Sequence, residues 1–480
     1  MRAKPTLKGM TSQPRLRIAP SPTGQLHVGT ARTALYNFLY ARHIGGQFAM
    51  RIEDTDVARS KREHADAFCN MLKWMGIDWD GDIVYQSDRF EIYRETITML
   101  LNQGLAYECF ETAEELEAIN AERKAHKLPP GYDGRSRNLT SEQKQKFQDE
   151  NRPRTVRFIT PDEGTSSFND ALRGTVSVQW ENVSDFVIER GDGTPTFFLA
   201  NAVDDLEMGI THAIRGEDLL DSTHRILAIR RALGTDEQQF YAHTPMILAP
   251  DRSKLSKRHG AVSLESYKDA GYLPEAMVNY LALLGWAPKD GREVISLEEM
   301  IQEFDIHDVN HSGAIFDVKK LEWMNGEYLR AIETSDLVAR LEPEAHERFG
   351  SQVDSSLFDR AVELAQPRAT TTNSMIDQME CLFSQSFSLS AEAQAQLSAM
   401  PDARAVLDAV EKHLETCEWN TDAIDLRDLV NGLGLKPRKA LPIVYMAIEG
   451  SVSGLPLFDA IHMIGREVSL TRIRVALESL

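Results

Sequence analysis

A single histidine stands in a loop crowded with prolines, glycines and hydroxyl groups, PSPTGQLHVGT at residues 20–30. A short alternating stretch precedes the loop and apolar residues at helical spacing follow it, which predicts a strand, a turn and a helix. Gly24 and Gly29 remove Cβ atoms where a bound group could approach the backbone. Free N–H groups at a helix start favour phosphate, and His27 could donate a hydrogen bond to a phosphate oxygen. A plain turn before a helix is the simpler interpretation of the same residues.

A second loop, KLSKRHG from residue 254, carries two lysines around a serine and follows the last expected strand. Lysines so placed can neutralise the charge that builds on a triphosphate as pyrophosphate leaves. Lysine–serine loops are common, so this one gains meaning only in combination with the histidine loop. Together they predict that the second loop closes over ATP from the side opposite His27.

Three acidic residues lie at the end of the next expected strand, where Phe48, Met50 and Ile52 alternate before Glu53-Asp54-Thr55-Asp56. Strand, helix and strand form a βαβ unit, and ligands of open parallel sheets gather at the carboxyl ends of the strands. We therefore expect Glu53 and the histidine loop to face one crevice.

The elements that position these loops change in character along the chain. Residues of about 105–200 combine a charged helix with short strands, which indicates an inserted α+β module. Sheet-like pattern returns at 212–248, the chain is mostly helical after 262, and no strand is expected beyond about 335. The fold class predicted is multidomain α/β, with a nucleotide-binding sheet that is interrupted by an insertion and followed by helices.

Composition narrows the class of protein. The 480 residues are 42% hydrophobic, and no stretch reaches the length of a membrane span or forms an apolar signal core. The four cysteines form no CxxC pair, which argues against structural zinc and disulfides and favours a cytoplasmic location. The net charge of -20 disfavours a nucleic-acid partner only weakly, because binding depends on local basic patches such as those at 152–157 and 436–439.

Several motifs in order resemble one known family. HVGT at 27–30 resembles the HIGH signature, and KLSKR at 254–258 the KMSKS signature, of class I aminoacyl-tRNA synthetases. With RIAPSPTGQLHVGTARTALYNFLYAR, MRIEDTD, GYDGRSRN, IRGEDLL and FDVKKLEWMN, essentially the whole chain is similar to the bacterial-type glutamyl-tRNA synthetases.

The resemblance implies two reactions: glutamate and ATP give glutamyl-adenylate and pyrophosphate, and the adenylate then acylates the 3′ end of tRNA-Glu. Magnesium would accompany the ATP, no zinc is expected, and the protein would be a monomer with tRNA-Glu, L-glutamate and ATP as partners and no membrane. The implied catalytic residues are His27, Lys254 and Lys257. The implied ATP-binding residues are Thr23, Gly24, His27, Gly29, Thr30, Lys254, Ser256 and Lys257.

The implied glutamate pocket needs cations for carboxylates and an acid for the ammonium group. Arg17 and Arg215 can supply bidentate forks and Glu53 the ammonium partner. The implied set is Arg17, Ala19, Ser21, Glu53, Asn201 and Arg215. Two positions depart from the family: Phe197 stands where a tyrosine is usual, and the insertion offers only Cys109 where some relatives bind zinc through paired cysteines.

The resemblance also implies the domain order. Residues 1–93 and 200–262 would form two halves of a Rossmann-like catalytic domain, and 94–199 an inserted domain that binds the tRNA acceptor end. Residues 263–334 would form a helical domain that contacts the tRNA stem, and 335–480 an all-helical anticodon-binding region in which Arg368 senses the third anticodon base.

Alternatives stay open at different levels. Glutaminyl-tRNA synthetases end in β-barrels, a shortened relative that glutamylates tRNA-Asp lacks the C-terminal region, and a small-molecule nucleotidyltransferase has no use for the helices after 335. Whether tRNA-Gln is also charged, and whether glutamate activation requires tRNA, does not follow from the sequence.

Overall fold

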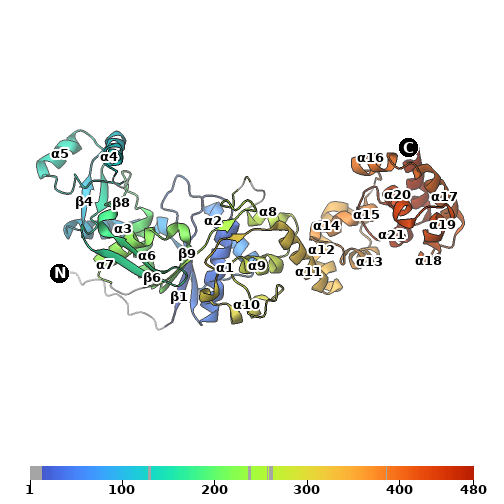
Figure 1. Cartoon of the computed structure of the whole chain (residues 1–480), viewed down its shortest axis with the longest axis horizontal. Helices are drawn as coiled ribbons and strands as arrows, with labels where there is room; N and C mark the ends of the chain where they lie inside the picture. The colour runs from blue at the N-terminus through green and yellow to red at the C-terminus, as the bar shows by residue number, and fades with distance from the viewer. Residues whose placement is uncertain (1–12, 128–130, 236–238, 257, 259–262, 385) are drawn as a thin grey trace. The chain divides into compact units, whose positions relative to one another are not determined.

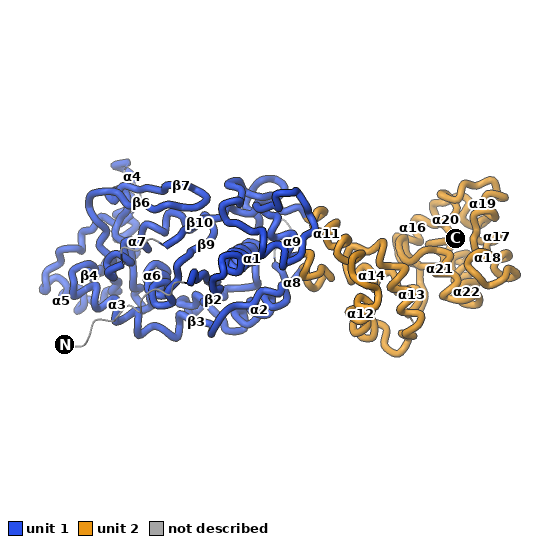
Figure 2. The backbone as a smooth tube through the Cα atoms, turned by 90° about the horizontal axis from the view of Figure 1, so that it is seen from below, with its two compact units in different colours: residues 1–266, 277–317 blue, residues 267–276, 318–480 orange. Residues whose placement is uncertain are grey.

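The computed structural model describes residues 13–127, 131–235, 239–256, 258, 263–384 and 386–480. The chain forms two compact units, coloured separately in Figure 2: unit 1 is residues 1–266 with 277–317, and unit 2 is 267–276 with 318–480. Within the described ranges, no helix is long and apolar enough to cross a membrane.

Unit 1 begins with the expected βαβ unit. Strand β1 (Arg15–Ile18) and strand β2 (Gln47–Ile52) are parallel, with Arg17 opposite Ala49, and helix α1 (Val28–His43) connects them. Both strands are almost fully buried, as parallel strands between helices are. Strand β3 (Val84–Tyr85) extends the sheet next to β2, and helices α2 (Arg62–Trp74) and α3 (Phe90–Asn102) flank it in sequence.

A second sheet of unit 1 has the order β7-β6-β10-β9. Strands β9 (His212–Gly216), β10 (Phe240–Thr244) and β6 (Thr165–Asp170) are parallel, and β7 (Gly174–Gln179) is antiparallel to β6. The backbone N–H of Thr211 donates to the carbonyl of Arg15 at 2.9 Å, so β9 begins beside β1. Helices α6 (Phe197–Glu207) and α7 (Ser222–Ala232) belong to the same unit.

Strand β6 is not expected from the sequence, because its buried positions include Ser166 and Asp170 rather than apolar residues alone. Both β6 and β7 lie within residues 94–199, and yet they extend the sheet of β9 and β10. The proposed boundary of the insertion at 94–199 remains a prediction, but part of that segment completes the sheet of β9 and β10.

The rest of that segment forms a separate antiparallel sheet, β4-β5-β8, at Ala106–Cys109, Thr155–Phe158 and Phe186–Glu189. Helices α4 (Ala113–Ala125) and α5 (Ser141–Asp149) lie beside it, away from α1 and β1 (Figure 1). Capping boxes begin both helices: Thr112 and Thr140 each accept a hydrogen bond from the third helical N–H.

Short elements complete unit 1. Strands β11 (Ile247–Leu248) and β12 (Ala314–Ile315) pair in parallel, and α10 spans Leu297–Glu303. Two further helices, α8 (Leu264–Asp269) and α9 (Pro274–Leu283), each have residues in both units.

The described part of unit 2 after residue 317 contains helices and no strand, so the predicted α/β region followed by a helical C-terminal half is confirmed. Two hydrophobic clusters form its core, one around α12 to α15 and the other around α16 to α22. The helices are α11 Val318–Ala331, α12 Thr334–Phe349, α13 Ser355–Ala365, α14 Thr372–Gln378, α15 Glu380–Phe383, α16 Ala391–Ser398, α17 Ala403–Thr416, α18 Thr421–Ile424, α19 Arg427–Gly432, α20 Pro437–Glu449, α21 Leu457–Ile464 and α22 Arg466–Glu478.

Candidate active site

A cavity of about 440 Å³ lies in unit 1, lined from β1, α1, β9, the turn after β10 and the loop after β11. It therefore joins the two loops that the sequence singled out, which are more than 200 residues apart. The predicted residues that line it are Arg17, Ala19, His27, Gly29, Thr30, Glu53, Asn201, Arg215 and Lys254.

Other predicted residues lie elsewhere. Ser21, Thr23 and Gly24 are exposed in the turn before α1, and Ser256 is half-buried in the second loop; none of them lines the cavity. Lys257 falls outside the described residues. Arg368 is exposed in unit 2, just after helix α13.

His27 is the N-cap of helix α1. Its ring accepts a hydrogen bond from one of the backbone N–H groups that we expected to be free at the helix start. Its Nδ1 accepts a hydrogen bond from the N–H of Gly29 at 3.1 Å, and the N–H of Thr30 bonds to the His27 carbonyl. A neutral imidazole that accepts at Nδ1 carries its proton on Nε2. The His27 ring at this turn therefore carries an N–H on Nε2, and its Nδ1 is the partner of the Gly29 amide.

The second loop is tied to the first by backbone pairing. Lys254 forms an antiparallel bridge with Leu248 of β11, and Ser263 forms one with His27. The N–H of Leu264 donates to the carbonyl of Leu26 at 3.0 Å, next to that second bridge. Both ends of the lysine loop are thereby anchored within one unit, with Lys254 exposed at the cavity.

Arg17 at the cavity floor is paired within the protein. Its Nε and Nη2 donate to the two carboxylate oxygens of Asp205 on α6, both at 3.1 Å. Burial alone would raise the pKa of Asp205, but the charges of Arg17 and Arg51 outweigh it and hold that pKa well below its usual range. The expected bidentate fork of Arg17 is thus already occupied, and a ligand meets only the remaining edge of its guanidinium.

Arg215 near the end of β9 is a different kind of cation. It is 6% exposed, lines the cavity, and forms no ion pair with any residue that the structure describes. Its Nε donates to His243 Nε2 at 3.1 Å and its Nη2 to Thr223 Oγ1 at 2.7 Å. Burial, together with the charge of Arg17, lowers the pKa of Arg215 to about 10, so it stays charged at neutral pH. A buried cation without a carboxylate favours an anion in the cavity.

Asn201 and Glu53 supply acceptors on the same cavity. Asn201 Nδ2 donates to Glu53 Oε1 at 3.2 Å, and Arg51 Nη2 donates to the same oxygen at 3.1 Å. The Oδ1 atom of Asn201 is buried and accepts no hydrogen bond from the described residues. A carboxylate and an amide oxygen side by side are suited to an ammonium group.

Comparison with known proteins identifies the architecture. Residues 13–323 match the family model described as the catalytic domain of class I tRNA synthetases (E and Q), and residues 336–477 match an anticodon binding domain. A glutamate–tRNA ligase of Caldanaerobacter subterraneus is 39% identical over 98% of both chains, and that of Aquifex aeolicus is 40% identical over 98% of this chain and all of its own. The chain belongs to the glutamate–tRNA ligase family.

A solved structure agrees with this assignment. A glutamate tRNA ligase from Elizabethkingia meningosepticum, crystallised with its amino acid, superposes with a TM-score of 0.81 at 32% identity, covering 97% of this chain and 99% of the other. As a member of the glutamate–tRNA ligase family, the chain is an aminoacyl-tRNA ligase of class I, as the motifs predicted. The helical residues after 317 also distinguish it from the β-barrel ending expected of a glutaminyl-tRNA synthetase.

Some cavity residues of this glutamate–tRNA ligase are not assigned from the sequence. Glu217 and Asp218, in the motif IRGEDLL, line the cavity; Glu217 Oε1 accepts the N–H of Met246 at 2.9 Å, and its other oxygen pairs with Arg173. Asp218 Oδ1 lies so close to Gly216 that a Cβ at this position would clash with it. The motif was recognisable, but only the fold shows which of its side chains face the cavity.

The structure shows the surroundings of the two positions that depart from the family. Phe197 begins helix α6 and lines the cavity, so the tyrosine that is usual here would place its ring at the site. The thiol of Cys109 donates to Glu111 Oε2 at 2.7 Å and accepts from Arg157 Nε at 3.2 Å. Within the described ranges no three histidine, cysteine, aspartate or glutamate side chains are grouped to hold a metal ion. The absence of zinc stays a prediction.

Proposed function

We propose that this glutamate–tRNA ligase activates L-glutamate with ATP in the described cavity and transfers the glutamyl group to the 3′ end of tRNA-Glu. One observation carries the assignment of substrate to site: Arg215 is a buried cation on the cavity, held by neutral side chains. A substrate with two carboxylates provides the anion that this position lacks.

Glutamate is held by groups of opposite charge. Arg215 contacts one carboxylate, and the remaining edge of Arg17 contacts the ligand from the floor of the cavity. The Glu53 carboxylate and Oδ1 of Asn201, which has no partner among the described residues, accept hydrogen bonds from the ammonium group. The Ala19 backbone lines the same cavity, and Ser21, which does not line it, is assigned to glutamate by the family resemblance alone. Glutamine would place a neutral amide against an unpaired cation, a loss on the order of several kcal/mol.

In the first step a carboxylate oxygen of glutamate attacks the α-phosphorus of ATP. The bond from that phosphorus to the β-phosphate oxygen breaks, and pyrophosphate leaves with the electron pair. The Nε2 proton of His27 and the ammonium group of Lys254 stabilise the charge on the phosphates. Gly29 and Thr30 contact the nucleotide from the cavity wall. Thr23, Gly24, Ser256 and Lys257 are assigned to ATP by the family resemblance alone.

In the second step a hydroxyl of the terminal tRNA ribose attacks the activated carbonyl carbon. The bond from that carbon to the AMP oxygen breaks, AMP leaves with the electron pair, and the hydroxyl proton passes to its phosphate. Positioning accounts for most of the catalysis, because no covalent enzyme intermediate is needed. The insertion at 94–199 binds the acceptor end, 263–334 contacts the stem, and 335–480, with Arg368, reads the anticodon.

Magnesium arrives with the phosphates of ATP. Among the described residues no three acidic, histidine or cysteine side chains are grouped to hold a metal ion, and Mg²⁺ carried by ATP usually keeps several waters instead of needing such a cage. Glu217 and Asp218 on the cavity are carboxylates that could contact its water ligands. The enzyme acts as a monomer in the cytoplasm.

The test is aminoacylation of separate tRNA-Glu and tRNA-Gln transcripts with labelled glutamate, alongside pyrophosphate exchange with and without tRNA. We expect charging of tRNA-Glu, and a fall of about a hundredfold or more in kcat/KM for glutamate in R215A. Charging of tRNA-Gln at a comparable rate would assign the enzyme to the non-discriminating type. No charging of tRNA-Glu, or an unchanged kcat/KM in R215A, would contradict the proposal.

A further inference from the structure

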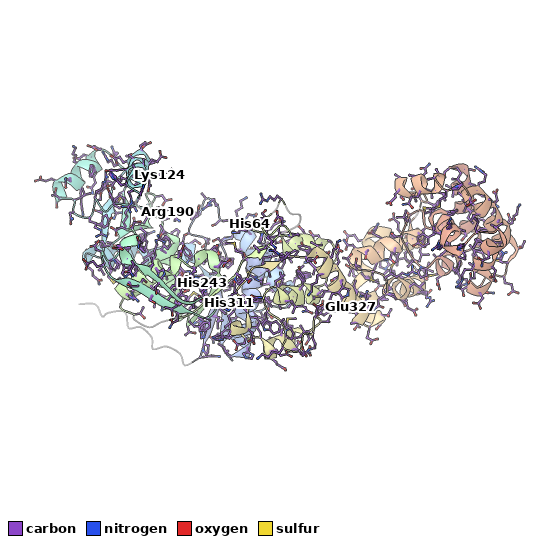
Figure 3. The ribbon with its side chains drawn as sticks, viewed as in Figure 1. His64, Lys124, Arg190, His243, His311 and Glu327 are labelled. Carbon is purple, nitrogen blue, oxygen red and sulfur yellow. The ribbon has the colours of Figure 1, made fainter. Side chains whose placement is uncertain are left out.

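A buried row of three side chains runs across three adjacent strands behind the cavity. Asp170 ends β6, His243 lies on β10, and Arg215 lies directly opposite His243 on β9. Their exposed fractions are 4%, 0% and 6%. Figure 3 labels His243 among the side chains of this sheet. Only Arg215 of the three reaches the cavity.

The protons of this row can be assigned from its contacts. Asp170 Oδ2 lies 2.6 Å from His243 Nδ1, and Asp170 Oδ1 accepts the backbone N–H groups of Leu172 and Arg173 at 2.9 Å each. Arg215 Nε, which always carries a proton, donates to His243 Nε2 at 3.1 Å. His243 is therefore neutral, with its proton on Nδ1 and a lone pair on Nε2.

We propose that Asp170 and His243 are positioning residues for glutamate binding: Asp170 fixes the His243 tautomer, and His243 Nε2 aims the Arg215 guanidinium into the cavity. This inference rests on the proposed role of Arg215. It explains why a fully buried histidine is joined to a carboxylate that never reaches the cavity.

A neutral imidazole orients the Arg215 guanidinium without neutralising its charge, as a carboxylate partner would. The fork of Arg17 is neutralised by Asp205, which leaves little charge for a ligand. Arg215 instead has its Nε and Nη2 held by the neutral acceptors His243 and Thr223. The guanidinium is thereby oriented while its charge remains available to the substrate.

Burial reinforces this neutral state. It lowers the pKa of His243 below the usual value of 6.5, with Arg215 adding to the effect and Asp170 opposing it. The Asp170 carboxyl has its pKa held below the usual range, since the hydrogen bond from His243 and the backbone donors outweigh its burial. An ionised Asp170 beside a neutral His243 is what the positioning role requires.

The experiment compares full-length D170N, H243N and H243Q in pyrophosphate exchange with tRNA present. In D170N the amide donates to His243 Nδ1, so the ring proton moves to Nε2. The Nε2 proton then faces the N–H of Arg215, and the hydrogen bond between them is lost. H243N keeps a donor toward Asp170 but loses the acceptor, whereas H243Q can return an acceptor to the Nε2 position. We expect KM for glutamate to rise about tenfold or more in D170N and H243N and less in H243Q, with KM for ATP within about twofold of wild type.

His224→Asn provides the matched control. His224 is 4% exposed, bonds to Ser166 of the same β6 strand at 2.9 Å, and does not line the cavity. H224N perturbs a buried polar contact of this sheet without touching Arg215, so we expect both KM values to stay near wild type. A melting scan of each variant shows whether the fold is retained.

The outcomes separate this inference from the proposed function. If R215A raises KM for glutamate but folded D170N and H243N do not, the positioning role is wrong and the glutamate site stands. If R215A itself leaves KM for glutamate unchanged, the proposed site is wrong. If KM for ATP and KM for glutamate rise equally in D170N, H243N and H224N, Asp170 and His243 only stabilise the fold. That result would overturn the positioning role.

Discussion

His27 and Ser263 form an antiparallel backbone bridge, so the histidine turn and the end of the lysine loop are fastened to each other. The bridge joins segments more than 230 residues apart in the chain. Lys254, at the other end of the loop, lies on the same cavity as His27. The fold itself therefore holds the two loops together at the cavity that we propose binds ATP.

Removal of the Lys254 charge should slow the chemical step. We expect K254A to lower kcat of pyrophosphate exchange about a hundredfold, because a cation facing the leaving pyrophosphate is lost, with KM for glutamate within about twofold. Lys289→Ala is the control, since Lys289 is 88% exposed and pairs with Asp308 away from the cavity. Equal activity of K254A and K289A would argue against the role of Lys254.

A side-chain hydrogen bond next to this bridge should affect KM for ATP rather than KM for glutamate. Glu265 Oε1 accepts the N–H of Leu26 at 3.2 Å, next to the His27 turn. E265A removes this acceptor, and we expect KM for ATP to rise about threefold to tenfold, while E265Q, which keeps an oxygen there, stays close to wild type. Initial-rate measurements over a range of ATP concentrations check this, and a normal KM in E265A would refute it.

A buried acid in unit 2 predicts how stability depends on pH. Glu449 is 8% exposed, and burial raises its pKa from 4.5 to about 7. Between these values the folded state binds more protons than the unfolded state, so stability falls as pH rises, by about 3 kcal/mol in all. We expect E449Q to gain in melting temperature relative to wild type as pH increases from 5 to 8. A constant difference between the two proteins across this range would show that Glu449 does not titrate as described.

The predicted anticodon contact lies in the same unit. Arg368 is exposed, and its charge acts on both Glu449 and Tyr445. If Arg368 senses the third anticodon base, R368A should narrow the preference for tRNA-Glu over tRNA-Gln by about tenfold, through loss of an edge hydrogen bond. Arg360→Ala, on the preceding helix α13 and paired with Glu363, should leave the preference unchanged. Unaltered relative kcat/KM in R368A would exclude this role.

Local sequence pattern was sufficient for the elements that carry the two loops. The alternation in 48–52 and the helical spacing after Val28 predicted β2 and α1, and the rule for parallel sheets placed Glu53 and His27 on one cavity. The pattern predicted free N–H groups at the start of this helix but did not show that the ring of His27 itself accepts the N–H of Gly29.

Pairing between distant polar residues was not predictable from pattern. In the sequence, Asp205 looks like an ordinary acidic residue of an amphipathic helix. Only the fold shows that it pairs with Arg17. Asp170 lies on a strand whose buried polar positions hide the hydrophobic period, so the row to His243 and Arg215 left no signal. Hydrogen bonds across a sheet depend on strand order and register, which a single sequence does not display.

The most direct measurement is a crystal structure of the full-length protein with a non-hydrolysable glutamyl-adenylate mimic. The account predicts one molecule in the cavity, with its glutamate side near Arg215 and Asn201 and its phosphate mimic within hydrogen-bond distance of His27. A mimic bound with no contact to either Arg215 or His27, or bound outside this cavity, would contradict the account.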